Sequence, residues 1–278
     1  MCQSCAEGGR RCRDRRRLQQ LITADLAPER TDDAPEVDWA ANGPQDGAEA
    51  VWRDYAPAIA TETIAVLAET RAAEPRTTSD IVAAIPAGAH PHGLEFRMKS
   101  PASLARKIRS RATVTAAAQA SGGLQSVSDK LTDLLRYTAV TERHDDLPAT
   151  AMSTIATLQG RGYTVVSAEH SYVDGNVYKG IHVLVQHGDE RPVEIQFHSL
   201  QSQAVKDDNH VDYEIERDRR NPYAAREAAH ARMTKRSSTI PAPRGLEDLA
   251  EIGGVPLVEK PYPNPYSVAH NEIEETNR

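Results

Sequence analysis

Residues 177–199 read VYKGIHVLVQHGDERPVEIQFHS, and this stretch decides the fold. Two runs rich in Val, Ile, Tyr and Phe flank a turn-type segment, HGDERP, at residues 187–192. Apolar runs joined by Gly, Asp and Pro predict two antiparallel strands and a connecting loop. We therefore expect a β-hairpin here, with the remaining elements arranged around it.

The second run of the hairpin alternates strictly between apolar and polar side chains, which predicts one buried face and one polar face. The apolar set is Val193, Ile195 and Phe197. If the polar faces of both strands coincide, they form one polar surface: Tyr178, His182, Glu194, Gln196 and His198. Alternation alone is equally consistent with an ordinary two-layer sheet that has one face in water.

Length and composition limit the classes of protein. The chain has 278 residues, 39% of them hydrophobic, and a net charge of −7. This suits one sizeable domain with appendages or two small ones, and argues against a protein that coats nucleic acid by bulk charge. The chain contains no run of about 20 apolar residues and no apolar N-terminal segment, which predicts neither a membrane span nor a signal peptide. We expect a cytoplasmic protein with no membrane partner.

Both ends of the chain are predicted to be flexible tails, at residues 1–45 and 236–278, around a domain at 46–235. The first tail holds all three cysteines, Cys2, Cys5 and Cys12, and the basic run RRCRDRRR at residues 10–17. Three thiolates are one ligand short of a structural zinc site, so an incidental tail is the favoured interpretation. The basic run suits nucleic acid or, more simply, solvent. The last segment is rich in proline, which predicts extended chain.

A basic segment, GLEFRMKSPASLARKIRSRAT, occupies residues 93–113. Ser100 followed by Pro101 predicts the N-cap and first turn of a helix. The segment has a single acidic residue, Glu95, and six cationic ones: Arg97, Lys99, Arg106, Lys107, Arg109 and Arg111. An acidic patch elsewhere in the fold could balance this charge, but we favour a ligand that carries phosphate.

The rest of the chain predicts an α+β or mixed α/β sheet domain. Helices are expected at 48–73 with a break near Pro57, at 79–85, 145–159, 200–220 and 223–233, and a strand at 163–173. Asp129, Asp133 and Arg136 fall at a helix-to-strand junction, where carboxylates either hold a metal or cap a turn. In the helix at 200–220 one polar stripe recurs at steps of three and four: Gln203, Lys206, His210, Tyr213 and Arg217. Ala204, Val211 and Ile215 are expected on the buried face.

Together these parts fit phosphoryl transfer to a nucleotide best. Carboxylates can hold Mg²⁺, cations can neutralise a polyphosphate, and an aromatic face can stack on a base. The sequence contains neither a Walker A glycine loop nor a G-x-G-x-x-G motif. It also lacks the G-x-S-x-G elbow of serine hydrolases and the H-E-x-x-H motif of zinc proteases, which weighs against those classes.

The segments that carry chemistry come in the order of the RelA/SpoT-like synthetase domain: FRMKSPASLARKI (96–108), DLLRYTAV (133–140), YKGIH (178–182), VEIQFHS (193–199), then Lys206, His210 and Tyr213. Over residues 94–217 the chain resembles this family, closest to its stand-alone small variants in phage-associated and toxin proteins. The resemblance implies an α+β fold, a nucleotidyltransferase-like mixed sheet flanked by helices. It also implies Mg²⁺-dependent transfer of pyrophosphate from ATP to the 3′-hydroxyl of a purine nucleotide.

The resemblance implies a role for each matching residue. Glu194 is the catalytic carboxylate and a Mg²⁺ ligand, and Asp133 is the second metal ligand. The donor side comprises Arg97, Lys99, Ser103, Arg106, Lys107 and Arg136. On the acceptor side Tyr178 stacks on the base, beside His182, Gln196, Lys206 and His210.

Two departures from the family pattern leave alternatives open. Asp133 and Arg136 are three residues apart with no intervening Gly, where the family has five, so Asp129 remains an alternative metal ligand. Val177 precedes Tyr178 where the family has Gly, which leaves the acceptor open between guanine nucleotides, adenine nucleotides and the 3′ end of tRNA. Further partners that the resemblance admits are an antitoxin and a second copy of the chain. The rivals are a tRNA-modifying toxin and a catalytically silent nucleotide-binding or phage structural protein.

Overall fold

A computed structural model describes residues 14–42, 46–114 and 123–267. The chain divides into two compact units. The first comprises Met1–Ala83, Gly93–Tyr137 and Gln186–Glu194, and the second Ala84–His92, Thr138–Val185 and Ile195–Arg278. The expectations for the three cysteines and for residues 10–13 lie outside the described residues.

The first unit is built from helices. They are α1 (Arg15–Leu18), α2 (Thr23–Leu26), η2 (Trp39–Asn42), α3 (Ala48–Asp54), α4 (Pro57–Ala84), η3 (Leu94–Phe96), α5 (Pro101–Val114) and α6 (Gly123–Asp129). As predicted, Pro57 separates α3 from α4, because its fixed φ and missing N–H suit the first turn of a helix. The helix expected separately at 79–85 is instead the end of α4, which continues through Pro75. Ile64, Leu67, Leu104 and Ile108 are wholly buried and form part of this unit's core.

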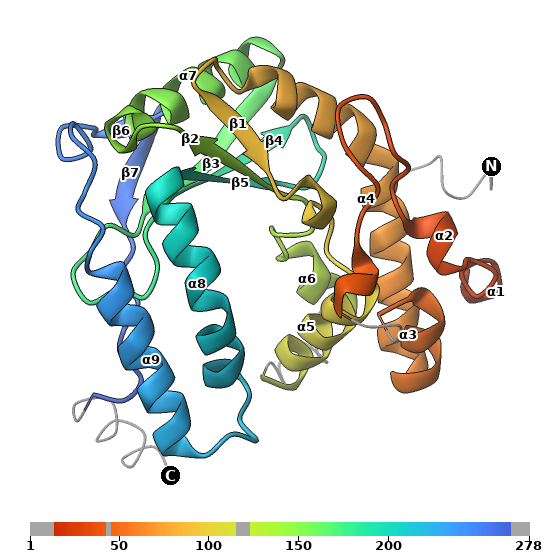
Figure 1. Cartoon of the computed structure of the whole chain (residues 1–278). Helices are drawn as coiled ribbons and strands as arrows, with labels where there is room; N and C mark the ends of the chain where they lie inside the picture. Colours follow the sequence, from red (N-terminus) through yellow and green to blue (C-terminus); the bar gives the residue numbers. More distant parts are fainter. Residues whose placement is uncertain (1–13, 43–45, 115–122, 268–278) are drawn as a thin grey trace. The chain divides into compact units, whose positions relative to one another are not determined.

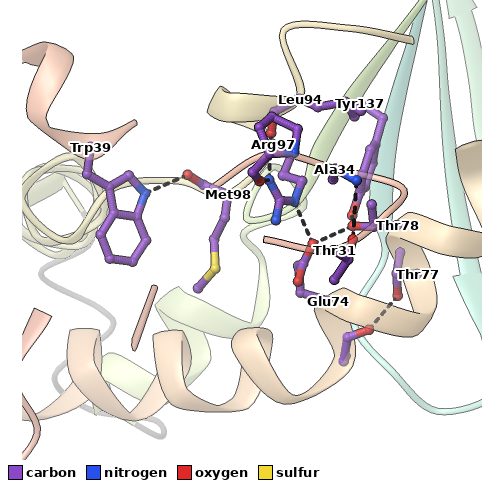
Figure 2. Close-up of polar contacts among 12 residues, drawn as sticks. Thr31, Ala34, Trp39, Glu74, Thr77, Thr78, Leu94, Arg97, Met98 and Tyr137 are labelled. Atoms are coloured by element: carbon purple, nitrogen blue, oxygen red, sulfur yellow. Dashed lines mark hydrogen bonds and ion pairs between the residues drawn. The ribbon is translucent and has the colours of Figure 1, made fainter. Parts of the chain in front are cut away.

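Residues 14–42, expected to be a loose tail, contain two short α-helices and one 3₁₀-helix. Leu18, Leu26, Ala34 and Trp39 are buried. The Trp39 indole Nε1 donates a hydrogen bond of 3.0 Å to the carbonyl of Met98 (Figure 2). A few apolar side chains spaced along a polar sequence therefore anchor this segment, and composition alone underestimates its order.

The second unit contains most of a seven-stranded sheet (Figure 1). The strands are β1 (Ala89–His92), β2 (Arg136–Thr141), β3 (Tyr163–His170), β4 (Ile181–His187), β5 (Val193–Ser199), β6 (Glu251–Ile252) and β7 (Val255–Glu259). Their order is β1-β2-β5-β4-β3-β7-β6. The sheet is mixed, because β1 pairs antiparallel with β2 and β6 with β7, whereas β7 pairs parallel with β3.

Helices cover the sheet in the second unit. Helix α7 (Leu147–Gly160), which follows η5 (His144–Asp146), packs against β3 and β6. Helices α8 (Leu200–Arg217) and α9 (Tyr223–Ser237) lie side by side (Figure 1). The α+β fold with a mixed sheet flanked by helices, predicted from the sequence, is therefore confirmed. No helix in the described residues is both long and apolar enough to cross a membrane.

The hairpin forms later in the sequence than predicted. Its first strand begins at Ile181, and the strand before it ends at His170, so residues 171–180 form a loop. The amide of Ser171 donates to the Gly180 carbonyl at 2.9 Å, and the Gly180 amide donates to Ser171 Oγ at 3.0 Å. Because these bonds close the loop at its base, Tyr178 lies in a loop instead of a strand.

The prediction for residues 236–278 also differs from the structure. Strands β6 and β7 lie in this segment, and β7 extends the sheet beyond β3. Ile240, Leu246, Ile252 and Tyr266 are buried. Pro256 is exposed in β7, near the edge of the sheet, which is where proline is tolerated in strands.

Helix α8 presents a different face to the protein from the one expected. Ala204 and Val211, expected inside, are exposed, and the exposed fraction of Val211 is 69%. The buried side chains are polar: Ser202, Gln203, Asn209 and Asp212. Asp212 accepts hydrogen bonds from Arg232 and Arg236 of α9, so the two helices are joined by ion pairs. Because the buried face of α8 is polar and is held to α9 by ion pairs, no apolar pattern in the sequence marks it.

Candidate functional site

In the first unit Lys99, Lys107 and Asp133 meet in what we call the Asp133 cluster. Asp133 Oδ2 lies 2.6 Å from Lys107 Nζ and 3.1 Å from Lys99 Nζ. Helix α5 supplies Lys107. The segment before α5 supplies Lys99, whose amide donates to the Leu134 carbonyl at 2.9 Å. Backbone pairing directly after Asp133 thus holds Lys99 beside it.

The Asp133 cluster carries a net charge of +1, because its one carboxylate is ionised. Burial alone raises the pKa of Asp133, but the ammonium groups of Lys99 and Lys107 outweigh it and lower this pKa to about 2. Burial lowers the pKa of Lys99 from its ordinary value, and the attraction of Asp133 counteracts part of that shift. Excess positive charge in a partly buried place favours the binding of an anion such as phosphate.

Asp133 also fits the donor chemistry that Mg²⁺ requires. Its second oxygen, Oδ1, is buried and has no hydrogen-bond partner among the described residues. Ionised carboxylate oxygens are preferred ligands of Mg²⁺, which takes one or two of them together with water and phosphate oxygens. No group of three or more His, Cys, Asp and Glu suited to a metal lies within the described ranges. Asp129, the alternative ligand, instead pairs with Arg191 at 3.1 Å.

Glu194 lies on β5, close in register to the Asp133 cluster. Its amide donates to the Leu135 carbonyl at 3.1 Å, two residues after Asp133. Its side chain is half-buried. This backbone hydrogen bond places Glu194, on β5, beside the segment that leads from Asp133 into β2.

Arg97 does not take part in this site, although the resemblance implied a phosphate contact. Its side chain is wholly buried, and its Nε donates to Glu74 Oε1 at 2.5 Å (Figure 2). Its Nη1 donates to the carbonyls of Pro35 and Leu94 at 2.7 and 2.9 Å. Thr78 also donates to the same Glu74 oxygen, at 2.5 Å. Arg97 therefore belongs to the interior of the first unit, and a polyphosphate cannot reach it without unfolding this network.

The remaining predicted donor residues lie at the surface of the first unit. Arg106 is exposed and donates to Ser103 Oγ at 3.1 Å, one turn earlier on α5. Arg136 is exposed, and its charge contributes to the lowered pKa of Lys99. Both guanidinium groups can bind phosphate oxygens in bidentate fashion.

The predicted N-cap of α5 is not the one observed. Ser100 Oγ is buried and has no hydrogen-bond partner among the described residues. Asp46 Oδ1 instead accepts a hydrogen bond of 3.1 Å from the Ala102 amide. Because a carboxylate already occupies the first turn, the positive end of this helix is neutralised from within the unit.

In the second unit, Tyr178, His182 and His198 form the Tyr178 cluster. The Tyr178 hydroxyl lies 2.6 Å from His182 Nε2 and 2.5 Å from His198 Nε2. A hydroxyl carries one proton, so it donates to one imidazole and accepts from the other. The Tyr178 ring is nearly perpendicular to both imidazoles, with interplanar angles of 81° to His182 and 89° to His198.

His198 is the buried anchor of the Tyr178 cluster. Burial lowers its pKa well below the ordinary value, and the nearby charges of Lys206 and His182 add to that effect. A neutral imidazole has one donor and one acceptor nitrogen, and both are used: Nδ1 lies 3.2 Å from Ser202 Oγ. His198 is therefore a neutral imidazole, and its hydrogen bond holds the Tyr178 hydroxyl in place.

Gly180 leaves the space that the Tyr178 cluster occupies. A Cβ atom at this position would lie 2.8 Å from His198 Cε1 and 3.0 Å from the Tyr178 hydroxyl. Both distances are too short for a carbon atom, so a larger residue would displace one of the rings. The Gly of YKGIH is required by close packing and not by its backbone conformation.

The other predicted acceptor residues lie near β5 and α8. Lys206 Nζ donates to Gln196 Oε1 at 3.0 Å, which joins the helix to the strand. His210 is exposed one turn further along α8. The structure thus brings Tyr178 together with His182, and Gln196 together with Lys206.

Sequence reasoning missed several residues that hold these clusters. Glu74 gave no signal, because its partner Arg97 is distant in sequence. The sequence pattern places His198 on the polar face without a role, and Gly180 occurs only within the segment YKGIH. The two-residue spacing of Tyr178, Gly180 and His182 in the sequence is a local signal that points to this glycine.

No family model and no curated protein matches this chain. Among solved structures, it is similar to small alarmone synthetase 1 from Bacillus subtilis bound to its product pppGpp. This similarity has 18% identity, a TM-score of 0.32, and covers 46% of this chain and 66% of that one, just under two thirds of its length.

Two further solved structures are similar. One is a GTP pyrophosphokinase family protein from Streptococcus pneumoniae, with 14% identity, a TM-score of 0.37, and coverage of 68% of this chain and 88% of that one. The other is a chain of the complex between the Type VI effector Tas1 and its immunity protein, with 23% identity, a TM-score of 0.28, and coverage of 47% and 75%.

Proposed function

We propose that this protein transfers pyrophosphate from ATP to the 3′-hydroxyl of a purine nucleotide, with Mg²⁺ as cofactor. The observation that carries the proposal is the Asp133 cluster, in which an ionised carboxylate lies against two ammonium groups. Its net positive charge favours a polyphosphate, and its carboxylate suits a divalent cation that accompanies one. The sequence resemblance supplies the reaction that uses both.

Asp133 and Glu194 are the residues that would hold Mg²⁺. When bound, the ion neutralises charge on the phosphate oxygens and helps to orient them. Lys99 and Lys107 bind the β- and γ-phosphates of the donor, and Arg106 adds a contact at the surface. The role of these side chains is to position the β-phosphorus for attack and to stabilise negative charge as it develops.

The transfer itself forms one bond and breaks one bond. The 3′-oxygen of the acceptor attacks the β-phosphorus of ATP. The bond between this phosphorus and the oxygen that bridges to the α-phosphate then breaks, and AMP leaves with the electron pair. Glu194 accepts the proton of the attacking hydroxyl. Tyr178 stacks on the acceptor base, while His182, Gln196, Lys206 and His210 contact the acceptor.

The proposal is tested by incubating the full chain with γ-³²P-ATP, Mg²⁺ and one acceptor at a time: GDP, GTP, ADP, ATP or tRNA. We expect label on a purine nucleotide, loss of label in EDTA, and loss of label in Glu194→Gln. The matched control is Glu190→Gln, four residues earlier on the same hairpin, where the side chain pairs with Arg76. This variant is expected to transfer label at the wild-type rate.

Two outcomes contradict the proposal in different ways. Label on tRNA alone, weakened steeply by salt, identifies a tRNA-modifying enzyme of the same reaction class. Label on no acceptor, with wild type and Glu194→Gln alike, indicates a nucleotide-binding protein without this activity. For the donor side, Lys107→Met should raise the KM for ATP, whereas Arg109→Met should not, because Arg109 lies over the Tyr55 ring.

A further inference from the structure

The segment that follows β7 is fastened to the loop that carries Tyr178. The fastening residue is Asn176, whose exposed fraction is 2%. Its Nδ2 donates to the carbonyls of Ser171 and Lys260, at 2.9 and 2.8 Å. Its Oδ1 accepts from the Tyr262 amide at 2.7 Å. Both donor hydrogens of the Asn176 side-chain amide and its acceptor oxygen are thus hydrogen-bonded within the second unit.

The fastening sets the position of Tyr262 relative to Tyr178. Asn176 lies two residues before Tyr178 and bonds directly to the backbone of Tyr262. The two tyrosine rings are 6.5 Å apart between centroids and inclined by 81°. This is an edge-to-face arrangement within the range of interacting aromatic pairs. Tyr178 itself is held at its hydroxyl by two histidines, and Asn176 holds the backbone of Tyr262 next to it.

We propose that Tyr262 is a further acceptor-binding residue, which forms with Tyr178 an aromatic corner for a purine base, and that Asn176 is its positioning residue. This rests on the proposed function, in which the Tyr178 cluster binds the acceptor. Two perpendicular rings offer a planar base one stacking face and one edge contact. A purine, with two fused rings, reaches both walls, whereas a pyrimidine that stacks on one wall ends short of the other.

The first test measures binding of GDP, ADP and CDP to the full chain by isothermal titration calorimetry. Tyr262→Leu should raise the Kd of the purine nucleotide that wild type binds by about tenfold, the size expected for one base-stacking contact, and should reduce its preference over CDP. Tyr262→Phe should bind like wild type, because the ring is retained. The matched control is Tyr223→Leu, an exposed tyrosine of the same unit that packs against Tyr266.

The second test separates positioning from a general structural role. In steady-state transfer, Asn176→Ala should raise the KM for the acceptor, and leave kcat and the KM for ATP within twofold of wild type. The double variant Asn176→Ala/Tyr262→Leu should bind no more weakly than Tyr262→Leu alone, because Asn176 acts through Tyr262. Circular dichroism confirms that each variant is folded before it is measured.

The possible outcomes separate this inference from the proposed function. A Kd for Tyr262→Leu within twofold of wild type overturns the inference even if pyrophosphate transfer occurs. Equal losses in kcat and in both KM values for Asn176→Ala overturn its positioning role. Tenfold weaker purine binding in Tyr262→Leu, in a protein that transfers no label, supports the inference and contradicts the proposed function. A wild type that binds neither GDP nor ADP contradicts both.

Discussion

The ion pair between Glu74 and Arg97 gives the sharpest test of the first unit's interior. Glu74→Gln removes one charge and keeps the shape of the side chain. Both partners are buried, with side-chain exposed fractions of 1% and 0%, so water cannot replace the lost carboxylate. The substitution therefore leaves the guanidinium of Arg97 as an uncompensated buried charge.

The expected loss of stability follows from that burial. Breaking a buried ion pair by removal of one partner costs about 3–5 kcal/mol. Two backbone carbonyls still accept from Arg97, so the hydrogen bonds are partly preserved and we expect the lower value, about 3 kcal/mol. With a urea m-value of about 2 kcal/mol/M, the unfolding midpoint should fall by about 1.5 M.

Tryptophan fluorescence is the suitable assay, because the chain has two tryptophans, Trp39 and Trp52, and both belong to the first unit. Glu29→Gln is the matched control: its pair with Arg71 is exposed, and its loss should change stability by about 0.5 kcal/mol or less. A loss of less than about 1 kcal/mol for Glu74→Gln would refute the reasoning, because leaving a buried guanidinium without its carboxylate should destabilise the fold by more than this.

Three further predictions concern other parts of the structure. Gly180→Ala should displace the His198 ring and raise the KM for the acceptor. Gly160→Ala is the control and should leave this KM unchanged, because a Cβ there meets nothing within 4 Å. The folded-state pKa of Asp133, about 2, is below its ordinary 3.8, so its contribution to stability is present above pH 3.8 and is lost as the pH falls toward 2. Urea unfolding between pH 2 and 5 should show this slope, and Asp133→Asn should reduce it. Asp212→Asn removes ion pairs to partly exposed arginines, so it should cost about 1 kcal/mol and lower Tm by about 2–4 °C in a calorimetric scan.

Local rules allowed a large part of the fold to be predicted. Alternation along β5 placed Val193, Ile195 and Phe197 in the core, where they are. Pro57 and Pro101 begin helices as predicted, because proline at the first helical position needs only its neighbours in sequence. In each case the physical cause lies within a few residues, and so it can be read from the sequence.

The errors arose where the cause is distant in sequence. Arg97 sits in a basic run, and only the fold brings Glu74 from α4 to neutralise it. The buried face of α8 is polar because α9 supplies arginines to Asp212, and no period within α8 reveals that. For the candidate site, the sequence predicted that Tyr178 and His182 share one polar surface, and their side chains are in contact. The ion pair between Lys99 and Asp133 was not predicted. The buried supports, His198 and Asn176, depend on non-local packing.

The parallel pairing of β7 with β3 has a consequence for synthesis of the protein. Ala168, Glu169 and His170 find their partners in Leu257, Val258 and Glu259, which leave the ribosome much later. Until then the outer edge of β3 presents unpaired amide and carbonyl groups, as edge strands do when nothing covers them. A nascent chain is therefore prone to pair with another copy of itself during this interval, and a chaperone that shields β3 would raise the yield of native protein.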